Sequence, residues 1–274
     1  MAPDDVAHQD SIDGAVTRRW TALRLDDVGA ASKRHEIYGR TRLGPVRFPG
    51  NWLFLKYLPG IKRWGPYREL RAREWERLLA LLDRAGSRMT VAITAGWVEW
   101  DGRIVPFPVK FPDEAAAIRE GVVAGLLEVA NHGYTHCVLA QMAFRPRAFA
   151  SNRAGHREFL DSVPESEQRE HLARSQGILQ DAFATEIVTF VPPGNALTRA
   201  TAAMAVEHGL RFLSCRRAAA LGPVAGLTVV DGDRVVDLHD RDIVVGGVRA
   251  LARVLARRPA GGFGTVREVG ARLA

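Results

Sequence analysis

The alternation of strand-like and helix-like segments along the chain constrains the fold most. Short apolar runs at 88–94 and 126–131 predict buried strands, apolar residues recur at helical spacing in 68–85, and Pro164 opens an expected helix at 164–183. Strands that alternate with helices form parallel sheets covered by helices. The sequence therefore predicts an α/β fold with parallel strands, either open or closed into a barrel.

The expected elements cover most of the chain after residue 19. Strands are expected at 20–25, 88–94, 126–131, 186–191, 210–214, 227–230 and 234–238, and helices at 68–85, 113–125, 164–183, 198–209 and 247–258. Residues 1–19 are expected to be a flexible lead. Residues 20–274 are expected to form a single domain, with an insertion at 30–67 whose glycines and prolines predict a long irregular segment.

Composition excludes several classes of protein. Of the 274 residues, 47% are hydrophobic and 25% are charged, as in globular domains. No apolar run reaches the ~18 residues that a membrane span needs. The first residues lack the basic start and apolar core of a secretory signal, and the two cysteines, Cys137 and Cys215, give no disulfide framework. We therefore expect a cytoplasmic protein.

The net charge of +7 is carried mainly by arginine, because only four of the 38 basic residues are lysines. Guanidinium groups bind phosphates and carboxylates in a bidentate manner, which favours a phosphate-linked substrate or contact with an anionic membrane. Coding bias explains the same excess equally well. No block of five like charges occurs, so a nucleic-acid partner is not expected.

Polar residues follow the predicted strands, where reactive side chains collect in parallel α/β folds. Asp26 and Asp27 close the first strand; they are either a general base and a metal ligand or a solvated turn. His132 and His136 are four residues apart, so one helical turn would place both on one face, a spacing that metal sites use. The alternative is two unrelated histidines.

Two further motifs follow later strands. Pro192 and Pro193 fix an extended turn that would present the amides of Gly194 and Asn195 to an oxyanion, unless the turn is an ordinary strand exit. His239 leaves a short apolar strand among carboxylates, which stabilise imidazolium and raise its pKa. It is a candidate general acid or a surface histidine.

Taken together and in this order, the motifs resemble those of the polysaccharide deacetylases of carbohydrate esterase family 4. The resemblance covers about residues 20–240 and implies a distorted parallel (β/α) barrel. It implies one divalent metal ion, zinc first and cobalt or nickel as alternatives, held by Asp27, His132 and His136. It also implies that Asp26 is the general base, that His239 is the general acid, and that an amide after the double proline holds the oxyanion.

The activity implied by the resemblance is hydrolysis of the amide of an N-acetylated sugar. Given the expected location, the substrate would be a nucleotide- or lipid-linked glycan precursor rather than a finished wall polymer. The candidate substrate contacts are Pro193, Gly194, Asn195, Trp97, Asn152, Arg153, His156 and Arg157. The alternative for 151–158 is a salt-bridged surface loop.

Two departures from the family pattern bear on function. Gly133 follows the first histidine, where Ser or Thr is usual, and Val191 stands where an arginine usually orients the base. The candidates for that missing role are Arg24, Arg153 and Arg241. The missing arginine also supports an alternative function, a catalytically inactive carbohydrate-binding protein that keeps the deacetylase fold.

Overall fold

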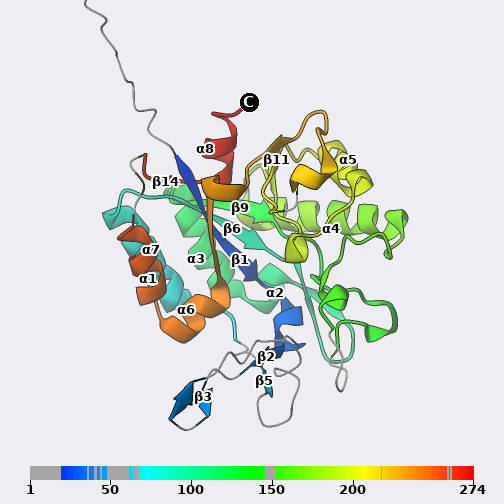
Figure 1. The fold of residues 1–274 in the computed structure, drawn as a ribbon, viewed down its shortest axis with the longest axis horizontal. Coiled ribbons are helices and arrows are strands. Elements are labelled where there is room, and N and C mark those ends of the chain that lie inside the picture. Colours follow the sequence, from blue (N-terminus) through cyan, green and yellow to red (C-terminus); the bar gives the residue numbers. More distant parts are fainter. Residues whose placement is uncertain are drawn as a thin grey trace, which may run out of the picture.

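A curled sheet of eight parallel strands forms the centre of the structure, which is a computed structural model. The strand order is β12-β11-β10-β9-β6-β1-β13, and β14 also pairs with β1. The strands are β1 (Thr21–Val28), β6 (Met89–Ile93), β9 (Leu127–Asn131), β10 (Thr189–Phe190), β11 (Phe212–Leu213), β12 (Thr228–Val229), β13 (Val235–His239) and β14 (Phe263–Gly264). The expected distorted parallel (β/α) barrel is confirmed (Figure 1).

The structure describes residues 20–35, 37–39, 42–43, 45–47, 62–64, 68–145, 152–216, 218–257, 259 and 261–274. The lead at 1–19 and much of the insertion at 30–67 lie outside these residues. The expected domain boundaries therefore stay a prediction.

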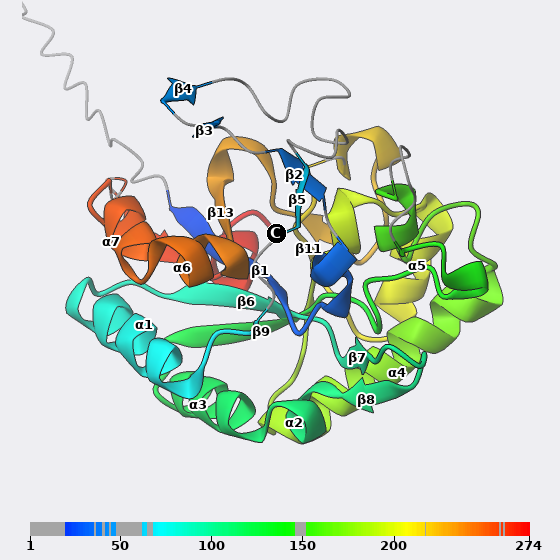
Figure 2. The ribbon, with the colours of Figure 1, turned by 90° about the horizontal axis from the view of Figure 1, so that it is seen from below.

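The larger helices form an arc on the outer side of the curled sheet, as Figure 2 shows for α1 to α4. The helices are α1 (Ala72–Arg84), α2 (Phe107–Lys110), α3 (Pro112–Val123), α4 (Glu165–Phe183), α5 (Arg199–Glu207), α6 (Asp240–Gly246), α7 (Arg249–Leu255) and α8 (Val266–Gly270). Among the described residues, no helix is long and apolar enough to cross a membrane.

Short elements complete the described part of the chain. Antiparallel pairs join β2 (Ile37–Gly39) to β5 (Lys62–Trp64), β3 (Arg42–Leu43) to β4 (Val46–Arg47), and β7 (Gly96–Val98) to β8 (Ile104–Pro106). A 3-10 turn, η1 (Ala31–His35), follows β1 directly and brings its side chains to the carboxyl end of the sheet.

Helix α1 illustrates how the apolar spacing becomes packing. Trp75, Leu78 and Leu82 recur at three- and four-residue intervals and are at most 1% exposed. Burying each such side chain stabilises the fold by about 1.5–3 kcal/mol. The chain leaves the helix at Gly86, whose φ of +53° suits glycine.

Two element predictions need correction. The helix expected at 247–258 is present as α7, but a helix that was not expected, α6, lies directly before it, and Gly247, with a φ of +65°, separates the two. Helix α6 begins at Asp240, directly after β13. The first strand is longer than expected and runs to Val28, so that Asp26 and Asp27 lie inside it.

Candidate metal and catalytic site

An irregularity near the end of β1 directs two adjacent carboxylates into the site. The pairing of β1 with β6 shifts register between Leu25 and Val28. Within this bulge, Asp27 has a left-handed backbone with φ of +69°. A bulge re-aims a side chain relative to regular alternation. As a result, Asp26 and Asp27 enter two neighbouring groups of side chains rather than opposite faces of the sheet.

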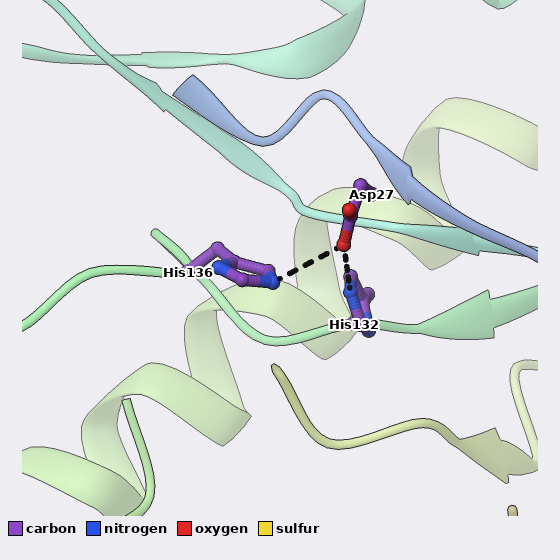
Figure 3. A group of neighbouring side chains, drawn as sticks. All are labelled: Asp27, His132 and His136. Carbon is purple, nitrogen blue, oxygen red and sulfur yellow. Dashed lines mark hydrogen bonds and ion pairs between the residues drawn. The ribbon is translucent and has the colours of Figure 1, made fainter. Parts of the chain in front are cut away.

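The first group is Asp27, His132 and His136, all of them buried (Figure 3). The Nε2 atoms of His132 and His136 lie 3.3 and 3.4 Å from Oδ1 of Asp27. The residues come from the ends of β1 and β9 and from the loop after β9. The structure thus brings together the three residues expected to be metal ligands.

The donor set fits a divalent cation. Ligand bonds of about 2.0–2.1 Å in a tetrahedron place neighbouring ligand atoms about 3.3 Å apart, close to both separations in the triad. Two imidazoles and one carboxylate are also a donor set found at catalytic zinc sites, where a fourth position stays open. Among the described residues, one other group of this kind occurs, Asp26, Asp237 and His239.

Neighbouring groups orient both imidazoles. Nδ1 of His132 lies 2.5 Å from the carbonyl oxygen of Val191, and Nδ1 of His136 lies 2.9 Å from the hydroxyl of Ser32. A carbonyl oxygen only accepts, so Nδ1 of His132 is the donor in this contact, and its Nε2 faces Asp27. Such outer partners fix the tautomer and ring orientation of metal-binding histidines.

Burial alone would raise the pKa of Asp27. Hydrogen bonds from His132 and His136 and the positive charge of His239 outweigh burial and hold the pKa of this carboxyl well below its usual value. Asp27 is therefore ionised at neutral pH, the form that binds a metal.

The loop that carries His132 and His136 is not the helical turn expected from their spacing. Gly133 and His136 have φ values of +77° and +54°, which no α-helix contains. The carboxylate of Glu158 holds the loop instead. It accepts hydrogen bonds from the amides of Tyr134 (2.8 Å), Thr135 (3.1 Å) and His136 (2.7 Å).

Glu158 also explains why glycine follows the first histidine. A Cβ atom on Gly133 would lie 2.5 Å from Oε2 of Glu158 and 3.0 Å from Cγ of Pro193. The other oxygen of Glu158 pairs with Nδ1 of His171 at 2.7 Å. Burial lowers the pKa of His171, but its bond to Glu158 outweighs burial, and the pKa is raised.

The second group contains the candidate base. Asp26 is 3% exposed and pairs with the guanidinium of Arg24, with Nε 2.7 Å from Oδ1 and Nη2 2.8 Å from Oδ2. Nη1 of Arg24 donates to the hydroxyl of Ser214 at 2.7 Å and to its carbonyl at 2.9 Å. Of the three arginines considered for the missing role, Arg24 is therefore the one that contacts Asp26. Arg241 lies beside Asp27 instead, 3.6 Å from Oδ2, and Arg153 is exposed.

The candidate acid lies beside Asp26, because β13 pairs with β1 so that His239 is the register partner of Asp26. Asp242 accepts from the His239 amide at 2.9 Å, and its carboxylate lies 3.8 Å from Nδ1. Burial lowers the pKa of His239, but Asp242 and the charges of Asp27 and Asp26 raise it to about 9. Asp237 pairs with Arg216, 2.5 Å away, so each carboxylate of this group has a guanidinium partner.

The double-proline turn supplies one candidate oxyanion donor rather than two. The amide of Asn195 donates to the carbonyl of Pro192 at 3.0 Å, which leaves the Gly194 amide as the candidate. The Asn195 side chain accepts from the amide of Arg216 at 3.1 Å. Pro193 is buried, and Gly194 is exposed with φ of +62°.

The other expected substrate contacts differ in their surroundings. Trp97 is 3% exposed, and the guanidinium of Arg34 covers its ring at 4.2 Å, so its faces are occupied by the protein. Asn152 and His156 are also buried, and both bond to the carbonyl of Phe144. These three side chains are therefore buried among other protein groups and do not line open space.

Arg157 remains the best placed of the expected contacts. It is partly buried, and a Cβ atom on Gly194 would lie 2.9 Å from its Cγ. Arg157 therefore packs over the candidate oxyanion donor.

Several residues of the site were missed by sequence reasoning. Glu158 and His171 contact the metal loop from positions more than 20 residues away, and Ser32 contacts His136 across 104 positions. No local sequence motif predicts contacts between residues this far apart. The only available signal was the dense polar cluster at 151–158, which contains Glu158.

The fold and the donor triad define a class of protein, a parallel β/α barrel with a candidate metal site at the carboxyl ends of its strands. The chain matches the family model "Polysaccharide deacetylase" over residues 65–213, just over half of its length. It belongs to the polysaccharide deacetylase family. No curated protein matches the chain.

Several solved structures are similar to this chain. One is a family 4 carbohydrate esterase from Streptomyces lividans in complex with acetate, at 14% identity and a TM-score of 0.45, covering 90% of this chain and 91% of that one. Another is a family 4 acetyl xylan esterase from Clostridium thermocellum in complex with a cobalt ion, at 15% identity and a TM-score of 0.45. That match covers 92% of this chain and 90% of the esterase chain.

A family 4 pseudoenzyme from Bacillus anthracis is also similar, at 12% identity and a TM-score of 0.45. The match covers 73% of this chain and 61% of that one. This chain thus spans about three fifths of the length of that pseudoenzyme chain.

Proposed function

We propose that this protein is a metal-dependent hydrolase that removes an acetyl group from an N-acetylated sugar in a glycan or glycan precursor. The supporting observation is the convergence of Asp27, His132 and His136 on one point, with the Asp26–Arg24 pair and His239 beside it. The triad would hold one divalent cation, zinc first and cobalt or nickel as alternatives.

A divalent cation supplies Lewis-acid polarisation of the amide carbonyl and lowers the pKa of water. Asp26, held by Arg24, accepts the proton of the attacking water. The amide of Gly194 donates a hydrogen bond to the oxygen that gains negative charge. His239, which carries a proton at neutral pH, delivers it to the departing sugar nitrogen, because an unprotonated amine leaves poorly.

The alternative is a carbohydrate-binding protein without catalysis, which the valine at position 191 suggested. Two contacts favour hydrolysis. Arg24 holds the base from its own strand, and the carbonyl of Val191 orients His132. Val191, which departs from the family pattern, therefore still contributes to the candidate site through its backbone carbonyl.

Some parts of the substrate hypothesis rest on composition alone. The phosphate linkage, the contact with an anionic membrane and the cytoplasmic location stay predictions, and the oligomeric state is open. Arg157 beside Gly194 is the residue through which we expect an anionic group on the substrate to be recognised.

Elemental analysis combined with acetate release tests the proposal. The purified protein, loaded with zinc, should release acetate from N-acetylated oligosaccharides. Asp27→Asn should lose both metal and turnover, whereas Asp26→Asn should keep the metal and lose turnover. Asp181→Asn, on the exposed side of α4, is the matched control. Full turnover by metal-free protein would overturn the proposal, and sugar binding without release by the metal-loaded protein would favour the alternative.

A further inference from the structure

A buried lysine that the proposed chemistry does not use lies beneath the site. Lys33, on η1, is 4% exposed. Its Nζ is 2.6 Å from Oε1 of Glu69, contacts the carboxylate of Asp240, and donates to the backbone carbonyl of Asp27 at 2.9 Å. One ammonium group therefore joins three segments that are far apart in sequence.

The charge state of Lys33 matches these contacts. Burial alone would lower the pKa of the ammonium group, but the charges of Asp240 and Glu69 outweigh burial and raise it. Lys33 is consequently charged, and a buried charge persists only where it is paired and hydrogen-bonded.

The first segment held by Lys33 is the turn that carries Asp27. The carbonyl of Asp27 accepts from Lys33 and, at 3.1 Å, from the amide of Ala30. Glu69 contacts the same turn, since its Oε2 accepts a hydrogen bond from the amide of Gly29 at 3.1 Å. The left-handed backbone of Asp27 is thus fixed by hydrogen bonds before and after Val28.

The second segment is the start of α6. Asp240 is its first residue and follows His239 directly. Asp240 is 1% exposed, so its contact with Lys33 fixes the backbone from which the His239 side chain projects.

We propose that Lys33 is a positioning residue that sets the backbone of Asp27 for metal binding and, through Asp240, the backbone of His239. The inference rests on the proposed function, because it takes Asp27 as a metal ligand. Lys33 acts from behind both residues, and the positioning is carried by its contacts with the Asp27 carbonyl and the Asp240 carboxylate.

Zinc affinity measured against a competing chelating dye, well below the unfolding temperature, tests this proposal. Lys33→Met keeps the length of the side chain and removes the ammonium group. Lys33→Met/Asp240→Asn also removes one of the two carboxylates, so that the cluster keeps its net charge. Arg119→Met, which removes a cationic bond to the carbonyl of Ala182 at the α3–α4 interface, is the matched control.

We expect zinc affinity to fall at least about tenfold in both Lys33 variants, as for loss of other outer partners of metal ligands, and to stay unchanged in the control. The double variant should recover thermal stability relative to Lys33→Met but not zinc affinity, because the ammonium group that donates to the Asp27 carbonyl is still absent. Wild-type affinity in Lys33→Met, or its return in the double variant together with stability, would overturn the proposal.

A crystal structure of the zinc-loaded wild type decides the matter where the variants fail to fold. Lys33 should lie within hydrogen-bond reach of the Asp27 carbonyl, with Asp27 in a left-handed conformation; a displaced ammonium group overturns the proposal. The two proposals fail separately. A wild type that binds no metal refutes the proposed function, whereas equal zinc binding by wild type and Lys33→Met refutes only the role of Lys33.

Discussion

Arg24 and Asp26, two residues apart on β1, are joined side by side, with Nε 2.7 Å from Oδ1 and Nη2 2.8 Å from Oδ2. Residues two apart on a strand share one face, so the strand itself brings the guanidinium to the carboxylate. The family pattern takes this arginine from the segment after a different strand. Here Val191 occupies that position, and its side chain forms a small buried cluster with Ala92 and Ala130.

Replacing Arg24 should impair the base without removing the metal. We expect Arg24→Met to lower kcat by about 10²–10⁴-fold, the range that general base catalysis contributes. Zinc content should be unchanged, because Arg24 does not contact the triad. Arg24→Lys is the control; it keeps the charge but loses the bidentate fork, so an intermediate kcat is expected. An Arg24→Met enzyme with wild-type kcat would show that Asp26 needs no orienting partner.

Restoring the usual serine at position 133 should damage the site. Gly133→Ser places a Cβ against Glu158 in a left-handed backbone, so the loop must move. We expect zinc affinity to fall about 10–100-fold, as for loss of an outer partner of a metal ligand. Competition with a chelating dye measures it. Gly177→Ser, where a Cβ meets nothing within 4 Å, is the control. Unchanged affinity in Gly133→Ser would show that Glu158 does not constrain the loop.

The fall of kcat at alkaline pH should reflect the loss of the proton from His239. The imidazolium of His239 is the active form, so kcat should fall as pH rises through the pKa of this group, which is about 9. A bound cation would offset the negative charge of Asp27 that helps to raise this pKa, so the fall in kcat should occur at or below pH 9. Asp242→Asn removes a partner that raises this pKa, and the fall should therefore move to lower pH. A rate profile to pH 10 for both proteins measures the shift. Coincident profiles would remove His239 from the role of acid.

Acid should destabilise the fold partly through His156. Burial, followed by the charge of His136, lowers the pKa of His156 to about 4. The unfolded chain therefore binds this proton more readily, and the contribution to stability is present above about pH 6.5 and is lost as pH falls towards 4. His156→Gln keeps a donor for the Phe144 carbonyl and does not titrate. Thermal unfolding at pH 7 and 5 should show a smaller loss for the variant, and equal losses would contradict the assignment.

Metal binding should stabilise the folded protein. At zinc concentrations of about 100 times Kd, the gain is about 2.7 kcal/mol, or roughly 5–10 °C in Tm for a chain of this size. Excess chelator should reverse the shift. Asp27→Asn should abolish it, because one of three donors is lost. A shift of the same size in Asp27→Asn would place the metal elsewhere.

The sequence by itself determined the fold class, and the family resemblance of its motifs pointed to the residues of the triad. Alternating apolar periods predict strands and helices because they reflect which face of each element is buried, and the buried faces of β6 and α1 are those expected. Asp26, Asp27, His132 and His136 stand out because each lies at or near the end of an apolar run, and the family resemblance implied which of them would bind the metal.

Only the tertiary structure decided how these residues are held. The bulge at Asp27, the irregular loop at His132 to His136 and the break at Gly247 depend on contacts that no local pattern records. Glu158 and Lys33 contact the site across long stretches of sequence, and the structure selects Arg24 from three candidate arginines. The hydrogen bonds of Glu158 and Lys33 join segments that meet only in the folded chain, so their identity follows from the packing of the whole barrel rather than from any one stretch of sequence.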